Sequence, residues 1–224
     1  SGVAPPTWPL PRWLHSFPGL PSAACHGLPG LRADSLPDRF GNALIDAWLA
    51  SQGRAPDSFS AVERLCYTGS RGTGALEYVP AAGPEPVGAE SLEVAELVRL
   101  ASTILGARQE LAVSFSDDRQ EQALRHLLAV GTSAGGARAK AVIAWNPVTG
   151  EVRSGQVAAE GFEYWLLKFD GVAGNRDREL ADPAGHGAVE YAYHLMARAA
   201  GLEMTDCRLL EEHGRRHFMT RRFD

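Results

Sequence analysis

A run of small residues followed directly by an apolar run sets the strongest constraint on how this chain can fold. Residues 130–140 (VGTSAGGARAK) are mostly glycine, alanine, serine and threonine, and residues 141–145 (AVIAW) are entirely apolar. Small residues let a backbone approach a ligand closely, and their N–H groups can converge on an anion. The pattern therefore predicts a β-hairpin over residues 130–145, with an anion-binding loop at its turn, Ser133–Gly136.

The sequence after this segment predicts more strands and a single helix. We expect strands at 155–157 and 164–169, a helix from about 187 to 200 that ends before Gly201, and a closing hairpin over 207–220 that turns at His213-Gly214. The apolar stripe of the helix is Val189, Tyr193, Met196 and Ala200, and Glu190 lies beside that stripe.

The first half of the chain predicts mainly helices. They are expected near 39–52 and 59–66, at 92–105 with Ser91 as the cap, and from Ser116 to about residue 128, with a short strand at 75–79 and an irregular segment over 1–30. The interpretation is an α+β fold with two units: an N-terminal subdomain at 1–110, and at 111–224 a nucleotide-binding subdomain with an antiparallel sheet and one packed helix.

The composition limits the classes of partner. A net charge of −5 gives no general attraction to nucleic acid or to an anionic membrane, and no apolar run approaches the roughly 20 residues that span a bilayer. Three widely spaced cysteines indicate reduced thiols and a cytoplasmic location. Only two of the 22 basic residues are lysines, Lys140 and Lys168, and both fall in the region of the expected anion site.

The chemistry of the expected site depends on Lys168, which lies in the apolar strand 164–169. A buried ammonium needs a carboxylate partner. Glu190 on the following helix is the first candidate and Glu179 the second. The plain alternative is a lysine on an exposed strand edge. Ser133 is either a phosphate-loop hydroxyl that can itself be phosphorylated or a serine that suits a turn.

Three other patterns favour structural roles. The glycine cluster at 69–74 lacks the strand and helix of a dinucleotide loop, so it is interpreted as a tight connection. His213 and His217 are separated by a glycine that breaks any helix between them, which argues against a metal pair. Three early acids, Asp34, Asp38 and Asp46, are expected to cap helices or lie on the surface.

A glycine loop, a strand lysine and a helix glutamate follow one another here in the order used by the small lobe of protein kinases. Several motifs then resemble the HipA family, the kinase toxins of bacterial toxin–antitoxin modules. They are Gly131–Lys140, Leu167–Asp170, Glu190-Tyr191 and Arg222–Asp224, with Leu36–Asp38 and Gly72–Glu77 resembling the family's N-terminal subdomain. The resemblance runs from about His26 to Asp224.

The resemblance implies a serine/threonine kinase that uses ATP and Mg²⁺, a HipB-type antitoxin as partner and glutamate–tRNA ligase as a candidate substrate. By position, Ser133 matches the autophosphorylated serine, and Lys168 with Glu190 the catalytic pair. The remaining nucleotide-binding positions are Gly135, Gly136, Ala137 and Lys140 in the loop, and Arg221 and Phe223 in the adenine hinge. The chain departs from the family at Arg138-Ala139, where Gln-Glu or Gln followed by another residue is usual before the loop lysine, and at Arg221, where the best-studied member has an acid.

The resemblance also implies a large lobe that supplies a base-like Asp, an Asn and the Asp that binds magnesium. None of these has a counterpart in residues 1–224, so the chain is expected to be an N-terminal fragment that is inactive alone, with the Mg²⁺ ligands elsewhere. The alternative hypothesis is a non-catalytic module that docks an antitoxin or another protein.

Overall fold

The chain forms a cluster of helices, a five-stranded antiparallel sheet and one further helix against that sheet. The computed structural model describes residues 24–28, 30–72, 76–83, 91–107, 118–131, 138–155, 160–172 and 184–223. Within these residues the α-helices are α1 (Gly30–Ala33), α2 (Arg39–Ser51), α3 (Ala61–Thr68), α4 (Val94–Ala107), α5 (Asp118–Gly131) and α6 (His186–Ala199), with short 3₁₀ turns at Ala24–Gly27 and Pro56–Ser58. The strands are β1 (Lys140–Trp145), β2 (Val152–Ser154), β3 (Glu163–Lys168), β4 (Cys207–Glu212) and β5 (Arg215–Arg221). The α+β class is confirmed.

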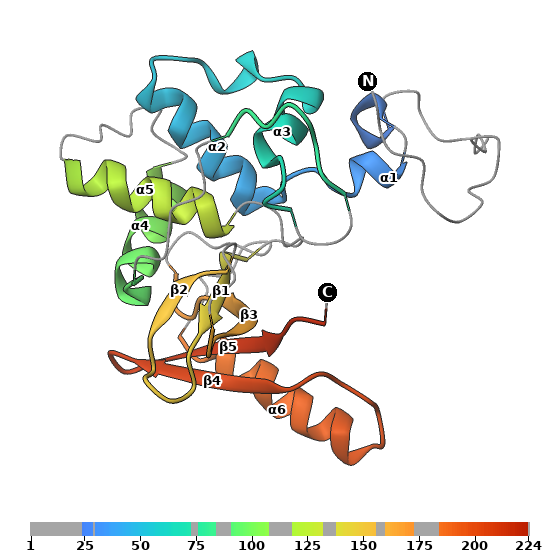
Figure 1. The fold of residues 1–224 in the computed structure, drawn as a ribbon, viewed down its shortest axis with the longest axis vertical. Coiled ribbons are helices and arrows are strands. Elements are labelled where there is room, and N and C mark those ends of the chain that lie inside the picture. Colours follow the sequence, from blue (N-terminus) through green and yellow to red (C-terminus); the bar gives the residue numbers. More distant parts are fainter. Residues whose placement is uncertain are drawn as a thin grey trace.

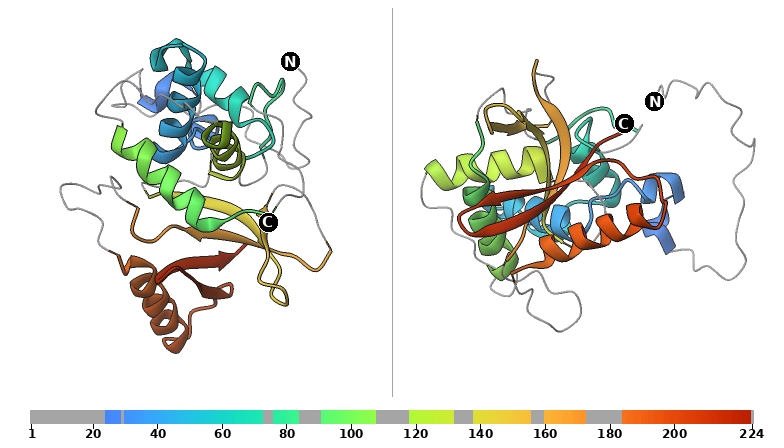
Figure 2. Two further views of the ribbon diagram at one scale, coloured as in Figure 1. Left: turned by 90° about the vertical axis from the view of Figure 1, so that its left-hand side faces the viewer. Right: turned by 90° about the horizontal axis from the view of Figure 1, so that it is seen from below.

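The sheet has the order β2-β1-β3-β5-β4, and every neighbouring pair is antiparallel. It separates the helices α2–α5 from α6, which lies along β4 and β5 at the opposite end of the molecule (Figure 1; Figure 2). The closing hairpin is confirmed. His213 (φ 47°) and Gly214 (φ 74°) both adopt left-handed backbone at its turn, as a two-residue hairpin loop requires.

Helix α2 shows how the sequence fixes the helical half. The Asp38 carboxylate accepts a hydrogen bond from the Gly41 N–H at 2.7 Å and so caps the first turn. Apolar residues at helical spacing then point into the core, where Phe40, Leu44 and Leu49 are fully buried. The helix ends at Ser51, as predicted, before Gly53 with its positive φ.

The core runs without a break from the helices into the sheet. Its fully buried members include Ile45 of α2, Tyr67 of α3, Ala101 of α4, Leu127 of α5, Ile143 of β1 and Leu167 of β3. Helix α5 packs on α2, α4 and β1 (Figure 2). The predicted division at residue 110 lies outside the described residues and stays a prediction.

The predicted hairpin over residues 130–145 is wrong. Val130 and Gly131 are the last residues of α5, and β1 pairs with β2 and β3 instead of with residues that precede the glycine-rich segment, residues 132–139. A Cβ at Gly131 would lie 3.0 Å from a Leu44 methyl group and 3.2 Å from the Phe40 ring. The small residue therefore serves close packing of α5 on α2, which a sequence pattern cannot distinguish from the start of a loop.

Three boundaries also differ from the predictions. Ser91 does not cap α4: it forms a bridge with Arg153, and the helix begins at Val94. Residues 76–79 form no strand, although the Tyr78 N–H bonds the Gly69 carbonyl. The strand expected at 155–157 is found earlier, as β2 at Val152–Ser154.

The predicted apolar stripe of α6 does not face the core. Val189, Tyr193 and Met196 are 50%, 67% and 63% exposed, whereas Gly187 and His194 are buried against the sheet. The close approach of α6 to β5 selects small and polar residues for the contact, so hydrophobicity alone pointed to the wrong face. None of the described helices is long and apolar enough to cross a membrane.

Candidate functional site

The predicted pairing of Lys168 with Glu190 is found in the structure. Lys168 is the last residue of β3, and its Nζ donates to the Glu190 Oε2 on α6 at 2.6 Å. Both side chains are half-buried, and the ammonium also lies 5.7 Å from the centre of the Phe218 ring. The lysine is therefore held by a carboxylate and an aromatic face but keeps access to solvent. Glu179, the second candidate partner, lies outside the described residues.

Gly187 brings Glu190 within reach of the strand. A Cβ at this position would lie 1.9 Å from the Arg216 carbonyl oxygen of β5. Only glycine allows the first turn of α6 to approach the sheet this closely. Glu190, three residues later, is consequently held over the end of β3.

Asp170 fixes the same turn from the strand side. Its buried carboxylate accepts hydrogen bonds from the N–H groups of Gly185, at 2.8 and 3.0 Å, and Gly187, at 3.4 Å. A carboxylate at a helix N-terminus also interacts favourably with the helix dipole. Since Asp170 follows Lys168 by two residues, one short segment orients both members of the ion pair. Asp170 is part of the Leu167–Asp170 motif, but its contact with α6 spans 15 residues, so no local sequence signal could have predicted it.

His217 holds Asp170 in turn. Its Nδ1 accepts a hydrogen bond from the Asp170 N–H at 2.9 Å, and the Arg215 guanidinium donates to the Asp170 and Gly171 carbonyls at 3.3 Å. The pKa of His217 is lowered to about 4, mainly by burial; the Asp170 carboxylate opposes this shift and the Arg215 guanidinium adds to it. The imidazole is thus a neutral acceptor. The described residues contain no group of three side chains suited to a metal ion, and His213 is exposed at the hairpin turn.

Lys140, predicted to be a loop lysine, has a structural partner. Its Nζ lies 2.6 Å from the Asp38 Oδ2, and the two side chains are only 4% and 6% exposed. Asp38 caps α2 as expected, but it is not a surface acid. In the register of β1 and β3, Lys140 lies directly opposite Lys168. The two lysines of this chain are thus neighbours, and each has its own carboxylate.

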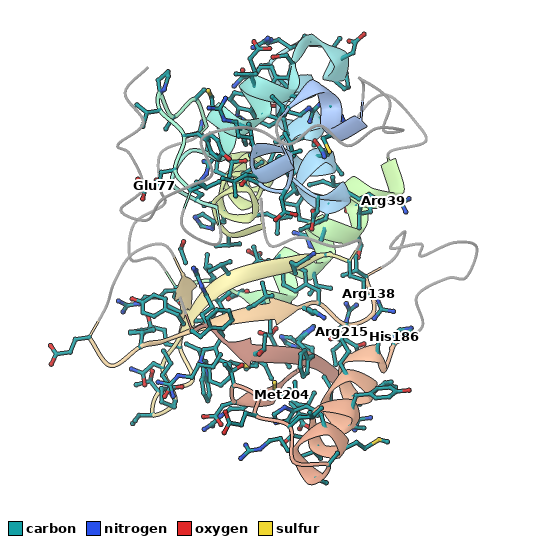
Figure 3. The ribbon with its side chains drawn as sticks, turned by 90° about the vertical axis from the view of Figure 1, so that its right-hand side faces the viewer. Arg39, Glu77, Arg138, His186, Met204 and Arg215 are labelled. Carbon is teal, nitrogen blue, oxygen red and sulfur yellow. The ribbon has the colours of Figure 1, made fainter. Side chains whose placement is uncertain are left out.

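Arg138 adds a second cation to Glu190. Its guanidinium lies 3.8 Å from the Glu190 Oε1, while Lys168 bonds the other oxygen. Figure 3 shows Arg138, Arg215 and His186 gathered beside the start of α6. The end of the glycine-rich segment therefore meets the strand lysine and the helix glutamate in a basic region of the surface.

The structure leaves part of the predicted site undescribed. Ser133, Gly135, Gly136 and Ala137 lie outside the described residues. Of the predicted hinge, Arg221 extends from the end of β5, with its guanidinium 3.9 Å from Glu163 and 4.0 Å from Asp206, and Phe223 is exposed. Arg221 pairs with Trp165, three positions before Lys168 on β3. The roles of these residues in binding adenine or phosphate stay predictions.

The fold and the site define an α+β protein in which a strand lysine and Arg138, which follows the glycine-rich residues in the sequence, both contact a helix glutamate. Two family models match the chain: the HipA N-terminal domain over residues 15–79 and the HipA-like C-terminal domain over residues 132–224. Together they cover more than half of its length, in the order expected for such a protein. The chain belongs to the HipA family. No curated protein and no solved structure gave a significant match.

Proposed function

We propose that this chain is the nucleotide-binding part of a HipA-type serine/threonine kinase. The observation that carries the proposal is the 2.6 Å contact between Lys168 and Glu190 at the end of a strand, with Arg138 3.8 Å from the same carboxylate. HipA proteins are in general kinase toxins, and both family models match this chain. ATP is the proposed ligand, with the ammonium of Lys168 directed at its phosphates.

The residues of the site suit an anionic ligand. Phosphoryl transfer needs little covalent work from a protein, but it needs charge neutralisation and alignment. Lys168 supplies a positive charge on a rigid strand, and Glu190 limits the directions in which that charge can point. Arg138 adds a second positive charge at the same carboxylate. When bound, ATP would supply the phosphoryl group, and Mg²⁺ would neutralise part of the charge on its phosphates.

Further parts of the proposal follow from the family and from sequence position. Ser133 is the proposed autophosphorylation site, and Arg221 and Phe223 form the proposed adenine hinge. The proposed partner is a HipB-type antitoxin in the cytoplasm, and glutamate–tRNA ligase is a candidate substrate. The large-lobe residues needed for transfer have no counterpart in residues 1–224. Catalysis is accordingly proposed for a longer protein that carries them.

Nucleotide binding can be tested on the 224-residue chain by calorimetric titration with ATP and Mg²⁺. We expect weak binding that Lys168→Ala reduces about 10- to 100-fold, since a hydrogen bond to a charged group contributes roughly 1.5–3 kcal/mol. Arg153→Ala is the matched control, because Arg153 is also a strand cation, paired with Glu151 at 2.7 Å. Its affinity should stay within about twofold of the wild type, because Arg153 lies on β2 opposite Ala144, away from the strand ends that carry Lys140 and Lys168. Equal affinity of Lys168→Ala and wild type would refute the proposed role.

Autophosphorylation is tested in a longer protein that includes the large lobe. Mass spectrometry should find phosphate on Ser133, and Lys168→Ala should abolish it. A phosphate adds nearly two negative charges, which would repel nucleotide phosphates at the same loop. Consistent absence of this phosphate from active protein would contradict the assignment of Ser133.

The alternative, a non-catalytic module that docks an antitoxin or another protein, has one observation in its favour. Three apolar side chains of α6, Val189, Tyr193 and Met196, are at least half exposed. Contiguous exposed apolar surface is typical of interaction sites. A chain that binds no ATP but copurifies with a HipB-type antitoxin would favour this second function.

A further inference from the structure

The ion pair between Asp38 and Lys140 joins the two halves of the chain. The residues are 102 positions apart, and their contact lies between the region matched by the HipA N-terminal model and the region matched by the C-terminal-like model. Both side chains are almost completely buried. Buried ions are retained only with close partners, so this contact is a specific connection between the halves.

The helical half of the protein holds the Asp38 carboxylate in place independently of Lys140. One carboxylate oxygen, Oδ1, accepts from the Gly41 N–H and caps α2, while the other, Oδ2, accepts from the Lys140 Nζ. Helix α2 is anchored in the core by Phe40 and Leu44, both fully buried. The carboxylate is therefore a rigid point on the helical half.

Lys140 is the first residue of β1 and comes directly after the glycine-rich segment. Its neighbour Ala139 is tied to the other strand, because the Phe169 N–H donates to the Ala139 carbonyl at 3.1 Å. Asp38 adds a side-chain tether to this backbone bond. The helical half of the protein therefore fixes the position at which the glycine-rich segment ends and β1 begins.

The same contact gives each of two neighbouring lysines a separate carboxylate partner. Lys140 and Lys168 lie directly opposite one another on β1 and β3. Asp38 neutralises the first and Glu190 the second, both at 2.6 Å. Without Asp38, the ammonium of Lys140 would lose this carboxylate while lying across the strand pair from a second lysine. Each lysine thus depends on a carboxylate from a different helix.

We propose that Asp38 and Lys140 are positioning residues that couple the N-terminal region to the nucleotide site. Their ion pair sets where the glycine-rich segment leaves for β1, so the affinity for ATP depends on a residue of the N-terminal region. The inference rests on the proposed ATP-binding function. It assigns Lys140 a role different from that of a direct phosphate ligand.

Asp38→Asn separates these two roles for Lys140. Asparagine keeps an oxygen that can cap α2 but removes the charge that neutralises Lys140. The expected result is an ATP affinity at least fivefold weaker than that of the wild type, measured by titration well below the melting temperature. If Lys140 were a phosphate ligand, its release from Asp38 would leave the affinity unchanged or make it tighter. That result would overturn the inference.

The double variant Asp38→Asn/Lys140→Met tests whether the effect is merely structural. It removes both charges and leaves no unpaired buried ion, so the melting temperature should recover toward that of the wild type. The affinity should remain weak, because the tether is still missing. Recovery of both the melting temperature and the affinity would show that the pair only supports folding. Where Asp38→Asn fails to fold, Asp38→Glu replaces it, because this variant keeps Lys140 but displaces the carboxylate that holds it; it should also bind ATP more weakly, and wild-type affinity would overturn the inference.

Asp46→Asn is the matched control. Asp46 lies on the same helix and bonds Arg64 at 2.8 Å, within the helical half and with greater exposure. Its loss should leave the ATP affinity unchanged. A wild-type chain that binds no ATP would overturn both the proposed function and this inference. Binding that is lost in Lys168→Ala but unchanged in Asp38→Asn would overturn the inference alone.

Discussion

The protonation of His217 should make the folded protein sensitive to mild acid. The imidazole is buried, and its pKa is lowered from 6.5 to about 4. The unfolded chain therefore binds a proton between these values while the folded chain does not. The unfolding free energy is therefore highest above pH 6.5 and decreases as the pH falls from 6.5 toward 4. For these two pKa values the linkage relation gives a loss of about 2 kcal/mol in unfolding free energy between pH 7 and pH 5.

Urea denaturation at pH 7, 6 and 5 measures this loss, and His217→Asn provides the comparison. The asparagine oxygen can still accept from the Asp170 N–H, but it has no proton to gain in this range. The variant should be less stable than the wild type at pH 7, since packing is lost. Between pH 7 and pH 5 the variant should lose about 2 kcal/mol less unfolding free energy than the wild type. All other titrating groups are the same in the two proteins, so the difference reports on His217 alone.

Equal pH dependence in the two proteins would refute the reasoning. It would mean that His217 has the same pKa in the folded and unfolded states. His217 would then not be the neutral, buried acceptor of the Asp170 N–H.

If His217 is that acceptor, acid should open the start of α6 before the rest of the protein unfolds. Hydrogen exchange at residues 185–190 would detect this local opening.

Two further predictions concern packing. Gly187→Ala would place a methyl group 1.9 Å from a β5 carbonyl oxygen, so it should lower the unfolding free energy by about 1–3 kcal/mol and weaken ATP binding. Gly30→Ala, with no atom within 4 Å of the added Cβ, should change stability by less than about 0.5 kcal/mol. Leu127→Ala in the core of α5 should lower the unfolding free energy by about 2–5 kcal/mol. Val148→Ala, on a 91% exposed side chain, is its control in the same denaturation assay and should stay within about 0.5 kcal/mol of the wild type.

The sequence contained enough information for elements whose signals are local. Helix α2 has a capping acid and apolar residues at helical spacing, and the β4–β5 hairpin has a His-Gly turn. The pairing of Lys168 with Glu190 could also be predicted, because a buried ammonium needs an acid and the following helix offers one at a suitable place. These inferences need only neighbouring residues and one electrostatic requirement.

Features that depend on contacts between distant segments could not be predicted. Gly131 ends a helix because it packs on α2, and no local pattern separates this case from a loop. The buried face of α6 contains Gly187 and His194, whose roles come from the closeness of β5. The partner of Lys140 is 102 residues away, so only the fold shows that it is Asp38.

The scarcity of lysine in this chain has an experimental use. Apart from the N-terminus, its primary amines are the pair that face one another across β1 and β3. Isotope-labelled reductive methylation would therefore place its two side-chain reporters at the proposed nucleotide site, one buried and one half-buried. An NMR spectrum of such a sample would follow the site directly, without a crowded background of surface signals.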